Sequence, residues 1–469
     1  MCMPVPRPAL PFQFFKTPIQ VFFDAERISS DGGLLLVRQI DDRLGISFWF
    51  AQCLPDSRAP QLTVHSRHEQ VRQRLYQIIQ GYPDCNDANE LRNDPLFKMA
   101  CDRDPDDKQG LSSQSTLCRL ENVATPQVIR KLIRRLEDRY VESLPETTNI
   151  IVLDIDTTED PAHGQQEFVG FNAHYDTNMY LHLLLFDGEG ELISALLRPG
   201  RAGAAKGVAG LLARIVRKLK ARFPQAQILV RGDGAFATPA ILNTLEGLNQ
   251  ELGEVDYLLG LPKNSRLVTL LQPTLDEAKE RYQQTKKPVQ LFTDFFYKTK
   301  DSWPHERRVI GKAEHTALGL NPRFLVTSLE GFSPELLYKR GYCGRGEAEN
   351  SIKDLKNALC SDRLSCRGYW ANFLRLLFFA AAYRLMYGLR AELAALLQQR
   401  QQQGEPVGPD LGRSQFDTLR LKLLKVGAQV KRLSRRIVVR MSAAFPLAQL
   451  FGELSRRLQA PPKWVVAPG

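Results

Sequence analysis

The sequence predicts an α/β protein in which a mixed β-sheet is covered by helices, and two observations support this prediction. From about residue 147 onward, β-rich segments separated by turns follow one another at 149–156, 167–171, 179–186 and 191–197. After them, helical patterns at 204–223 and 239–248 alternate with a short apolar run at 227–230. Hairpin-like strands followed by alternating helices and strands are typical of a mixed sheet with helices on its faces.

The N-terminal region, residues 1–140, is predicted to be mostly helical. Helical periodicity is clear over 64–79 and again over 115–123, where Ser112-Ser113 precede the segment as capping residues. The segment 128–139 carries a run of basic residues: Arg130, Lys131, Arg134, Arg135 and Arg139. Such a face is either a solvated surface or a contact for DNA.

The C-terminal part begins with the longest apolar stretch, 372–389, which contains Arg375 and Arg384. Two arginines within a bilayer would be costly, so this stretch is expected to be a buried helix and not a membrane span. The polar segment 398–406 is expected to be a linker.

A basic segment without a single acid follows at 421–440. Its cationic residues are Lys422, Lys425, Lys431, Arg432, Arg435, Arg436 and Arg440, interleaved with valine and isoleucine. The pattern suits a basic strand pair or a helix that lies along a phosphate backbone, and Lys431, Arg432, Arg435 and Arg436 are the candidate DNA contacts. A solvated hairpin is the alternative.

Composition sets limits on these expectations. The chain has 469 residues, of which 43% are hydrophobic and 25% charged, as in an ordinary soluble globular protein. A chain of this length is expected to divide into about two to four domains. The balance of 63 Lys and Arg against 52 Asp and Glu gives a net charge of +11 and a pI near 9.2, which favours a polyanionic partner without establishing one.

Several classes of site and segment are not indicated. The chain has eight cysteines, with no Cys-x2-Cys pair and no nearby histidine pair at zinc spacing, which is typical of a reduced, cytosolic protein. Residues 1–6 lack a charged region followed by an apolar run, so no signal peptide is expected. His163, His174 and His182 match no metal motif, and a Gly-x4-Gly-Lys loop for ATP is absent from the sequence.

Acidic residues lie at the ends of two predicted strands. Asp154 and Asp156 lie two positions apart and point to the same side of a strand, so alternation does not choose between them. Asp233 sits just past the apolar run 227–230, between two glycines. Catalytic groups in open α/β sheets commonly lie at that edge, and glycines allow close approach, although a simple turn aspartate is the alternative.

A third acidic position belongs to a helical motif. Four residues spaced three, four and seven positions apart share one face of a helix: Tyr342, Arg345, Glu349 and Lys356. Glu347 is two positions from Glu349, about 200° around the helix, and is expected to face away. A carboxylate framed by these neighbours suits an acid that holds a metal while cations hold phosphate, and a solvated face with i,i+4 ion pairs is the alternative.

These motifs carry a family resemblance. The spacing matches Tyr-x2-Arg-x3-Glu-x6-Lys, and the chain resembles bacterial insertion-sequence transposases with an RNase H-like core and a DDE metal site. Leu-Asp-Ile-Asp-Thr-Thr at 153–158 looks like the first acidic strand of that family, and Arg-Gly-Asp-Gly-Ala-Phe at 231–236 looks like the second. The specific motifs cover roughly residues 140 to 390. More loosely, the resemblance extends to Gly-Tyr-Pro-Asp at 81–84 and Leu-Ser-Ser-Gln-Ser at 111–115.

The resemblance implies roles for particular residues. The family places its first metal ligand just before a Thr-Thr pair, which selects Asp156 and leaves Asp154 as a structural acid. The implied catalytic and metal-ligating set is Asp156, Asp233 and Glu349, holding two Mg²⁺ ions, with Mn²⁺ as an alternative. The residues implied to hold phosphates near the cleaved DNA end are Tyr342, Arg345 and Lys356.

Between Asp233 and Glu349 lie 349 − 233 = 116 positions, more than one strand and a connector require. The excess, 262–334, contains strand-like segments at 289–296, 307–310 and 324–327 and resembles the β-rich insertion of this transposase branch. It is basic through Lys298, Lys300, Arg307, Arg308 and Lys312. Related enzymes hold a flipped base on an aromatic ring of this insertion, which would make Trp303 a DNA contact, although a core position is the alternative.

The resulting layout has five parts. A helical N-terminal DNA-binding region (1–140) precedes the first part of an RNase H-like core (141–261), the insertion (262–334), the second part of the core (335–390) and a linker with a basic C-terminal region (391–469). The resemblance implies a transposase that binds terminal inverted repeats, cleaves double-stranded DNA at the element ends and joins the 3′ ends to target DNA, as a dimer on DNA. A stand-alone RNase H-like nuclease and an inactive DNA-binding derivative are the alternatives. The implied location is the bacterial cytoplasm, at the nucleoid when DNA is bound.

Overall fold

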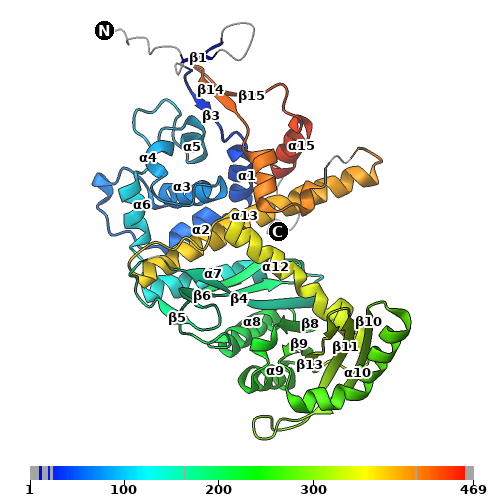
Figure 1. Ribbon diagram of the computed structural model, residues 1–469. Helices are drawn as coiled ribbons and strands as arrows, with labels where there is room; N and C mark the ends of the chain where they lie inside the picture. The colour runs from blue at the N-terminus through cyan, green and yellow to red at the C-terminus, as the bar shows by residue number, and fades with distance from the viewer. Residues whose placement is uncertain (1–9, 13–18, 22–24, 163, 407–408, 460–469) are drawn as a thin grey trace.

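A single large sheet runs through the lower half of the computed structural model, and a helical region stands above it (Figure 1). The structure describes residues 10–12, 19–21, 25–162, 164–406 and 409–459. The N-terminal residues 1–6, considered above for a signal peptide, and His163 lie outside these ranges. The sheet has ten strands and contains both parallel and antiparallel pairs, which confirms the prediction of a mixed α/β fold.

The centre of the sheet is strand β4 (Ile150–Pro161). It pairs antiparallel with β6 (Thr177–Asp187) and parallel with β8 (Gln227–Gly232), and β8 pairs parallel with β9 (Val255–Leu261). The outer partners of β6 are β5 (Gly170–Asn172) and β7 (Leu192–Pro199). The predicted strands are present, although the one expected at 167–171 begins only at Gly170. The helices expected near 204–223 and 239–248 are α8 (Val208–Arg222) and α9 (Pro239–Leu252).

The sheet separates two apolar cores because alternate residues of its strands point to opposite faces. On β6, Leu183 and Leu185 pack with α8 and α9, whereas Leu184 and Phe186 pack with the helical region on the other face. This region comprises α1 (Leu34–Leu44), α2 (Ile46–Cys53), α3 (Arg67–Ile79), α4 (Ala88–Leu91), α5 (Pro95–Ala100), α6 (Gln114–Glu121) and α7 (Pro126–Ser143).

Segment 262–334 extends this same sheet and does not form a separate β-rich domain, which corrects the expectation. Strand β13 (Arg323–Thr327) pairs with β9, and β11 (Arg307–Thr316) joins β13 to β10 (Val289–Tyr297) at the sheet edge. The short β12 (Gly319–Leu320) pairs with β11. The segment also contains a 21-residue helix, α10 (Ser265–Thr285), whose Leu267, Leu271, Leu275 and Ala278 are buried in the core shared with α8 and α9.

The long helix α13 (Tyr369–Gln402) joins the helical region to the sheet. It spans 34 residues, crosses the boundary expected at 390 and includes the first part of the segment expected to be a linker. Glutamine supports a helix as well as a solvated linker, so the polar run 398–402 continues the helix with an exposed face. In the described part of the chain, no helix is long and apolar enough to cross a membrane.

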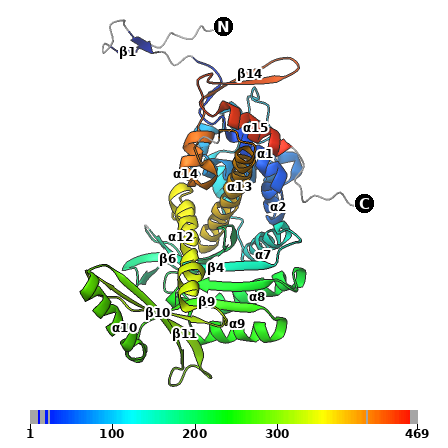
Figure 2. The same ribbon diagram turned by 90° about the vertical axis from the view of Figure 1, so that its right-hand side faces the viewer.

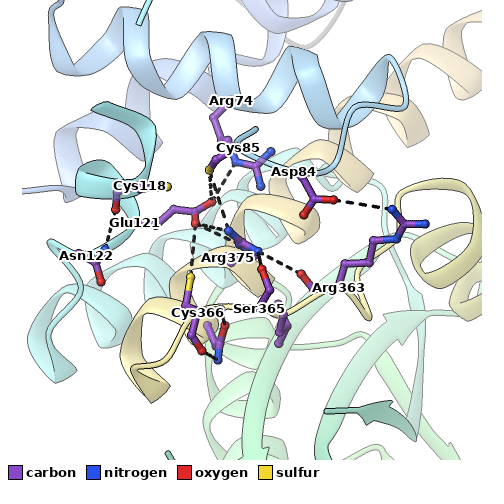
Figure 3. Close-up of polar contacts among 12 residues, drawn as sticks. Arg74, Asp84, Cys85, Cys118, Glu121, Asn122, Arg363, Ser365, Cys366 and Arg375 are labelled. Atoms are coloured by element: carbon purple, nitrogen blue, oxygen red, sulfur yellow. Dashed lines mark hydrogen bonds and ion pairs between the residues drawn. The ribbon is translucent and has the colours of Figure 1, made fainter. Parts of the chain in front are cut away.

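Glu121 of α6 is the buried centre of the contact between the helical region and α13 (Figure 3). Its carboxylate accepts hydrogen bonds from Arg74 of α3 at 2.9 Å and from Arg375 of α13 at 2.7 and 3.0 Å. The thiols of Cys85 and Cys366 lie 3.4 and 3.5 Å from its two oxygens. Residues from three separate parts of the chain therefore neutralise and satisfy one buried acid.

The two ends of the described chain meet in a small sheet at the top of the molecule (Figures 1 and 2). Strand β14 (Ala428–Arg432) pairs with β15 (Ile437–Met441) on one side and with β3 (Ile28–Ser29) on the other. The other elements here are the strand pair β1 (Leu10–Phe12) and β2 (Ile19–Val21) and the helices α14 (Phe416–Leu419) and α15 (Ala448–Gln459). The basic C-terminal segment is thus a strand pair, one of the two forms expected.

Candidate active site

Asp156 and Asp233 lie side by side at one edge of two neighbouring parallel strands. The register of β4 and β8 pairs Ile155 with Gly232, and each acid is the next residue along its strand. A Thr157 backbone N–H donates to Asp156 at 2.8 Å, and the Ala235 N–H donates to Asp233 at 2.9 Å. The parallel pairing therefore brings together acids that are 233 − 156 = 77 positions apart.

Arg345 connects the first and the third predicted acid. Its guanidinium donates a 2.7 Å hydrogen bond to Asp156 Oδ2, and its other terminal nitrogen lies 3.6 Å from Glu349 Oε1. Its carbon Cζ also lies 5.8 Å from the centre of the Tyr342 ring. The side chains of Arg345 and Asp156 are only 13% and 14% exposed, whereas that of Glu349 is 60% exposed.

Electrostatics also tie Asp233 to this group. Burial raises the pKa of Asp156, Arg345 lowers it, and the negative charge of Asp233 raises it, with a net upward shift. For Arg345, burial lowers the pKa, but the attraction of Asp156, Tyr342 and Asp233 outweighs burial and raises it. Asp233 therefore acts on both members of the Arg345–Asp156 ion pair.

The donor types fit a divalent cation, although the carboxylates are not arranged around one. Three oxygen-donating acids are the ligands that hard cations prefer, and a cation would offset the burial of Asp156. Among the described residues, no group of three or more histidine, cysteine or acidic side chains is placed to hold a metal ion. Arg345 lies between Asp156 and Glu349, and in this conformation the two carboxylates form ion pairs with its guanidinium.

The helical motif is less regular than the sequence predicts. After α11 (Pro334–Leu336), the chain forms a π-helical segment at 337–342 and a 3₁₀ turn at 343–345, followed by α12 (Gly346–Lys353) and another π-helical segment at 354–358. The expected stripe is kept for Tyr342, Arg345 and Glu349. Lys356 lies beyond α12, in the second π segment, where it forms a 3.2 Å ion pair with Glu159 of β4.

Asp154 has the structural role that the sequence favoured. It is fully buried, and Arg231 donates to both of its carboxylate oxygens at 2.6 Å. Arg231 also donates to the Gly341 carbonyl at 2.7 Å. A Cβ at Gly344 would lie 2.7 Å from the same guanidinium, so only glycine fits there without a shift. Asp154 and Arg231 therefore fix the backbone that carries Tyr342 and Arg345.

Tyr175 and the Asp160–His182 pair belong to no motif that reveals them in the sequence. Burial raises the pKa of Tyr175, a hydrogen bond to Thr157 lowers it, and the charges of Glu159, Asp156 and Asp233 raise it. Asp160 and His182 form a buried 3.2 Å pair, which explains His182 without a metal. Tyr175 precedes β6, and Asp160 and His182 lie on the paired strands β4 and β6, an arrangement that sequence spacing does not show.

Trp303 does not have the exposed ring face that base stacking requires. It is 4% exposed, packs edge to face against Tyr297 and lies under Arg307, whose Cζ is 4.8 Å from its ring centre. The base-stacking interpretation is therefore wrong for this conformation, and the core alternative holds. Arg307 and Lys312 are likewise buried and form ion pairs with Glu246 and Glu314.

The basic strand pair lies far from the acids, at the opposite end of the molecule from β10 and α10 (Figures 1 and 2). Its exposed basic residues are Lys431, Arg432, Arg435, Arg436 and Arg440, and Arg432 forms a 3.1 Å ion pair with Asp104. Val430 is fully buried beneath them. The predicted DNA contacts therefore divide into two sets, one around Arg345 and one on β14–β15.

The other basic and N-terminal motifs have structural partners. On α7, Arg135 and Arg139 each form a 3.0 Å ion pair with Glu142.

At 81–84, the Tyr82 ring lies 4.0 Å below Lys425 Nζ, and Lys425 forms a 2.6 Å ion pair with Asp31. At 111–115, the Ser112 backbone exchanges two 2.9 Å hydrogen bonds with the Gln73 amide. The Lys425 contacts join the helical region to the C-terminal segment, and the other contacts lie within the helical region.

Comparison with known proteins gives a family match over nearly the whole chain. The family model described as transposase DDE domain group 1 matches residues 13–463. No curated protein matches the chain. Among solved structures, the chain is similar to a chain described as "Cryo-EM structure of piggyBac transposase synaptic complex with hairpin DNA", with 12% identity, a TM-score of 0.41 and coverage of 94% of this chain and 88% of that chain.

Proposed function

The chain belongs to the transposase DDE domain group 1 family, and we propose on this premise that it moves an insertion sequence. It binds the terminal inverted repeats, cleaves the DNA at the element ends and joins the 3′ ends to target DNA. The observation that carries the proposal is the link that Arg345 makes between Asp156 and Glu349, which are 349 − 156 = 193 positions apart. Metal-assisted phosphodiester chemistry requires acids from distant parts of the chain to meet around the metal ions.

Asp156, Asp233 and Glu349 would hold the divalent cations, with Mg²⁺ as the expected ion and Mn²⁺ as an alternative. Two such cations would activate the attacking water or 3′ hydroxyl and stabilise the leaving oxygen. Asp156 would be a more enclosed ligand than Glu349, since their side chains are 14% and 60% exposed, and the charge of its neighbour Asp233 acts on it. Thr157 and Ala235 hold the Asp156 and Asp233 carboxylates in place through their backbone N–H groups.

The cations of the motif would bind the DNA itself. Arg345 offers a planar guanidinium that can hold a phosphate with two hydrogen bonds, and Lys356 offers a point charge. Lys356 is partly buried beside Glu159, so a phosphate near β4 would compete with that carboxylate. Tyr342 lies against Arg345 and limits the directions in which the guanidinium can move.

The strand order supports an RNase H-like core. Strands β7, β6 and β4 form an antiparallel meander, and β8 and β9 follow on the other side of β4 in parallel pairing. Of the proposed catalytic acids, Asp156 lies on the central strand β4 and Asp233 directly follows the parallel strand β8. Glu349 lies on the later helix α12. Segment 262–334 interrupts this core by adding strands beyond β9.

Double-stranded DNA is the proposed partner, and two chains are proposed to hold two element ends in the active complex. The net charge of +11 opposes association of free chains and favours DNA. The exposed arginines and lysine of β14–β15 are proposed to bind DNA at a position remote from the acids. The bacterial cytoplasm is the proposed location.

Incubation of the protein and Mg²⁺ with labelled element ends and a target plasmid tests the proposal. We expect end-specific nicks followed by joined products, and we expect Asp233→Asn to bind the ends but to cleave none. Asp276→Asn, on the exposed side of α10, is the matched control and should cleave as the wild type does. Degradation without preference for ends would instead indicate a nuclease, and binding without cleavage would indicate an inactive derivative.

A further inference from the structure

Arg345 occupies the position between the acids that a cation would need. One terminal nitrogen of its guanidinium contacts Asp156 at 2.7 Å, and the other lies 3.6 Å from Glu349. Asp233 attracts the same guanidinium. A single side chain therefore interacts with all three proposed metal ligands.

A guanidinium and a divalent cation compete for these oxygens. Each hydrogen bond from Arg345 uses a carboxylate lone pair that a metal would also need. The positive charges would also repel one another at contact distance in a site where Asp156 and Arg345 are largely buried. Metal binding to Asp156 and Glu349 therefore requires Arg345 to leave at least one of them.

The backbone next to Arg345 is held by a contact from outside the motif. Arg345 ends a 3₁₀ turn and is followed by Gly346, beside which a Cβ would meet no atom within 4 Å. The preceding segment is held by the hydrogen bond from Arg231 to the Gly341 carbonyl. Displacement of Arg345 from the acids is then a rotation of its side chain about a backbone that this contact holds.

We propose that Arg345 is an internal counter-ion of the three acids, displaced from them when metal binds and retained by a DNA phosphate. The proposal rests on the proposed function, because it takes Asp156, Asp233 and Glu349 as the metal ligands. It makes metal and DNA binding mutually supportive, since a phosphate that holds Arg345 releases the carboxylates. Free protein then binds metal weakly, and metal loading is coupled to the presence of a DNA end.

Mn²⁺ titration of the full-length protein, followed by the paramagnetic resonance signal of free Mn²⁺, tests this proposal without relying on activity. In the absence of DNA, Arg345→Gln should bind Mn²⁺ about tenfold or more tightly than the wild type, because a charge-assisted competitor is removed. Arg345→Lys retains the charge and should remain closer to the wild type. Arg340→Gln, on the exposed side of the preceding π segment, is the matched control and should change nothing.

A second arm repeats the titration with a duplex of the element end. Wild-type affinity for Mn²⁺ should rise when the duplex is present, and this increase should be absent in Arg345→Gln. Equal or weaker Mn²⁺ binding by a folded Arg345→Gln protein, with folding checked by circular dichroism, would overturn the counter-ion role.

Asp156→Asn separates the two levels of the proposal. If it removes Mn²⁺ binding while Arg345→Gln fails to strengthen it, the counter-ion role is wrong and the metal site stands. If Asp156→Asn leaves Mn²⁺ binding unchanged, the metal site of the proposed function is wrong, and the counter-ion role is wrong with it.

Discussion

Asp154 and Arg231 form a buried ion pair in which both carboxylate oxygens accept hydrogen bonds of 2.6 Å from one guanidinium. The pair joins neighbouring strands β4 and β8 and reaches the motif backbone through the Gly341 carbonyl. Asp154 lies two residues before Asp156, and Arg231 lies two residues before Asp233. The same two strands therefore position the ion pair and the proposed catalytic acids.

Asp154→Ala should destabilise the protein by about 3–5 kcal/mol, because it leaves the buried Arg231 charge without a partner. The measurement is the free energy of unfolding in urea. The double variant Asp154→Ala with Arg231→Met should recover part of the loss, since both charges are then absent. A loss for Asp154→Ala below about 1 kcal/mol would show that the pair contributes no more than an exposed one.

Glu121→Gln should also destabilise the protein, and the effect should depend on pH. Burial alone would raise the pKa of Glu121, but the attraction of Arg74 and Arg375 outweighs it and lowers the pKa from 4.5 to about 2. A lowered pKa contributes stability that is present above the unfolded-state pKa and is lost as the pH falls through the folded-state pKa.

The difference in unfolding free energy between wild type and Glu121→Gln should therefore be constant above pH 4.5 and shrink as the pH falls from 4.5 to about 2. Thermal unfolding at several pH values measures it. The contacts that account for this dependence are those shown in Figure 3. A difference that does not change over this range would contradict the charge pairing of Glu121.

Asp187, the last residue of β6, should show the opposite dependence. Burial raises its pKa from 3.8 to about 7, and Glu191 adds to the effect. The folded state then holds a proton that the unfolded state has lost, so this residue should reduce stability as the pH rises from 3.8 to about 7. Asp187→Asn should remove this part of the pH dependence in the same thermal measurement, and an unchanged pH profile would contradict the prediction.

Lys356→Ala should weaken binding to element ends and make the salt dependence shallower. Each lost phosphate contact removes about one unit from the slope of log affinity against log salt concentration. Lys353→Ala, on the exposed side of α12, is the matched control. Fluorescence anisotropy at several salt concentrations measures the slopes of both variants and of the wild type. Equal slopes for Lys356→Ala and the wild type would mean that Lys356 only forms a structural ion pair with Glu159.

Removal of two arginines from the β14–β15 turn should affect binding and leave the chemistry intact. Arg435→Gln combined with Arg436→Gln should lower the salt slope by about two units, because both side chains are exposed. Cleavage of DNA already bound in excess protein should proceed at the wild-type rate, because the β14–β15 turn lies far from β4, the strand that carries Asp156 (Figures 1 and 2). A slower single-turnover rate would mean that the hairpin acts at the cleavage site.

The sequence by itself determined the mixed α/β class, most core strands and helices, and the motif residues. β-Rich runs bounded by turn residues identified β4 and β6. The motif spacing brought Arg345 and Glu349 together, because contacts within three or four residues of a helix follow from local geometry. The resemblance added the choice of Asp156 over Asp154.

Only the tertiary structure decided how distant segments meet. The length of α10, the continuation of the sheet into β10, the burial of Trp303 and the pairing of β14 with β3 all depend on contacts between residues far apart in the chain. The same holds for the placement of Arg345 against Asp156 and of Lys356 against Glu159. Sequence periodicity reports which face of an element is apolar, but the partner of that face is set by packing, which local spacing does not encode.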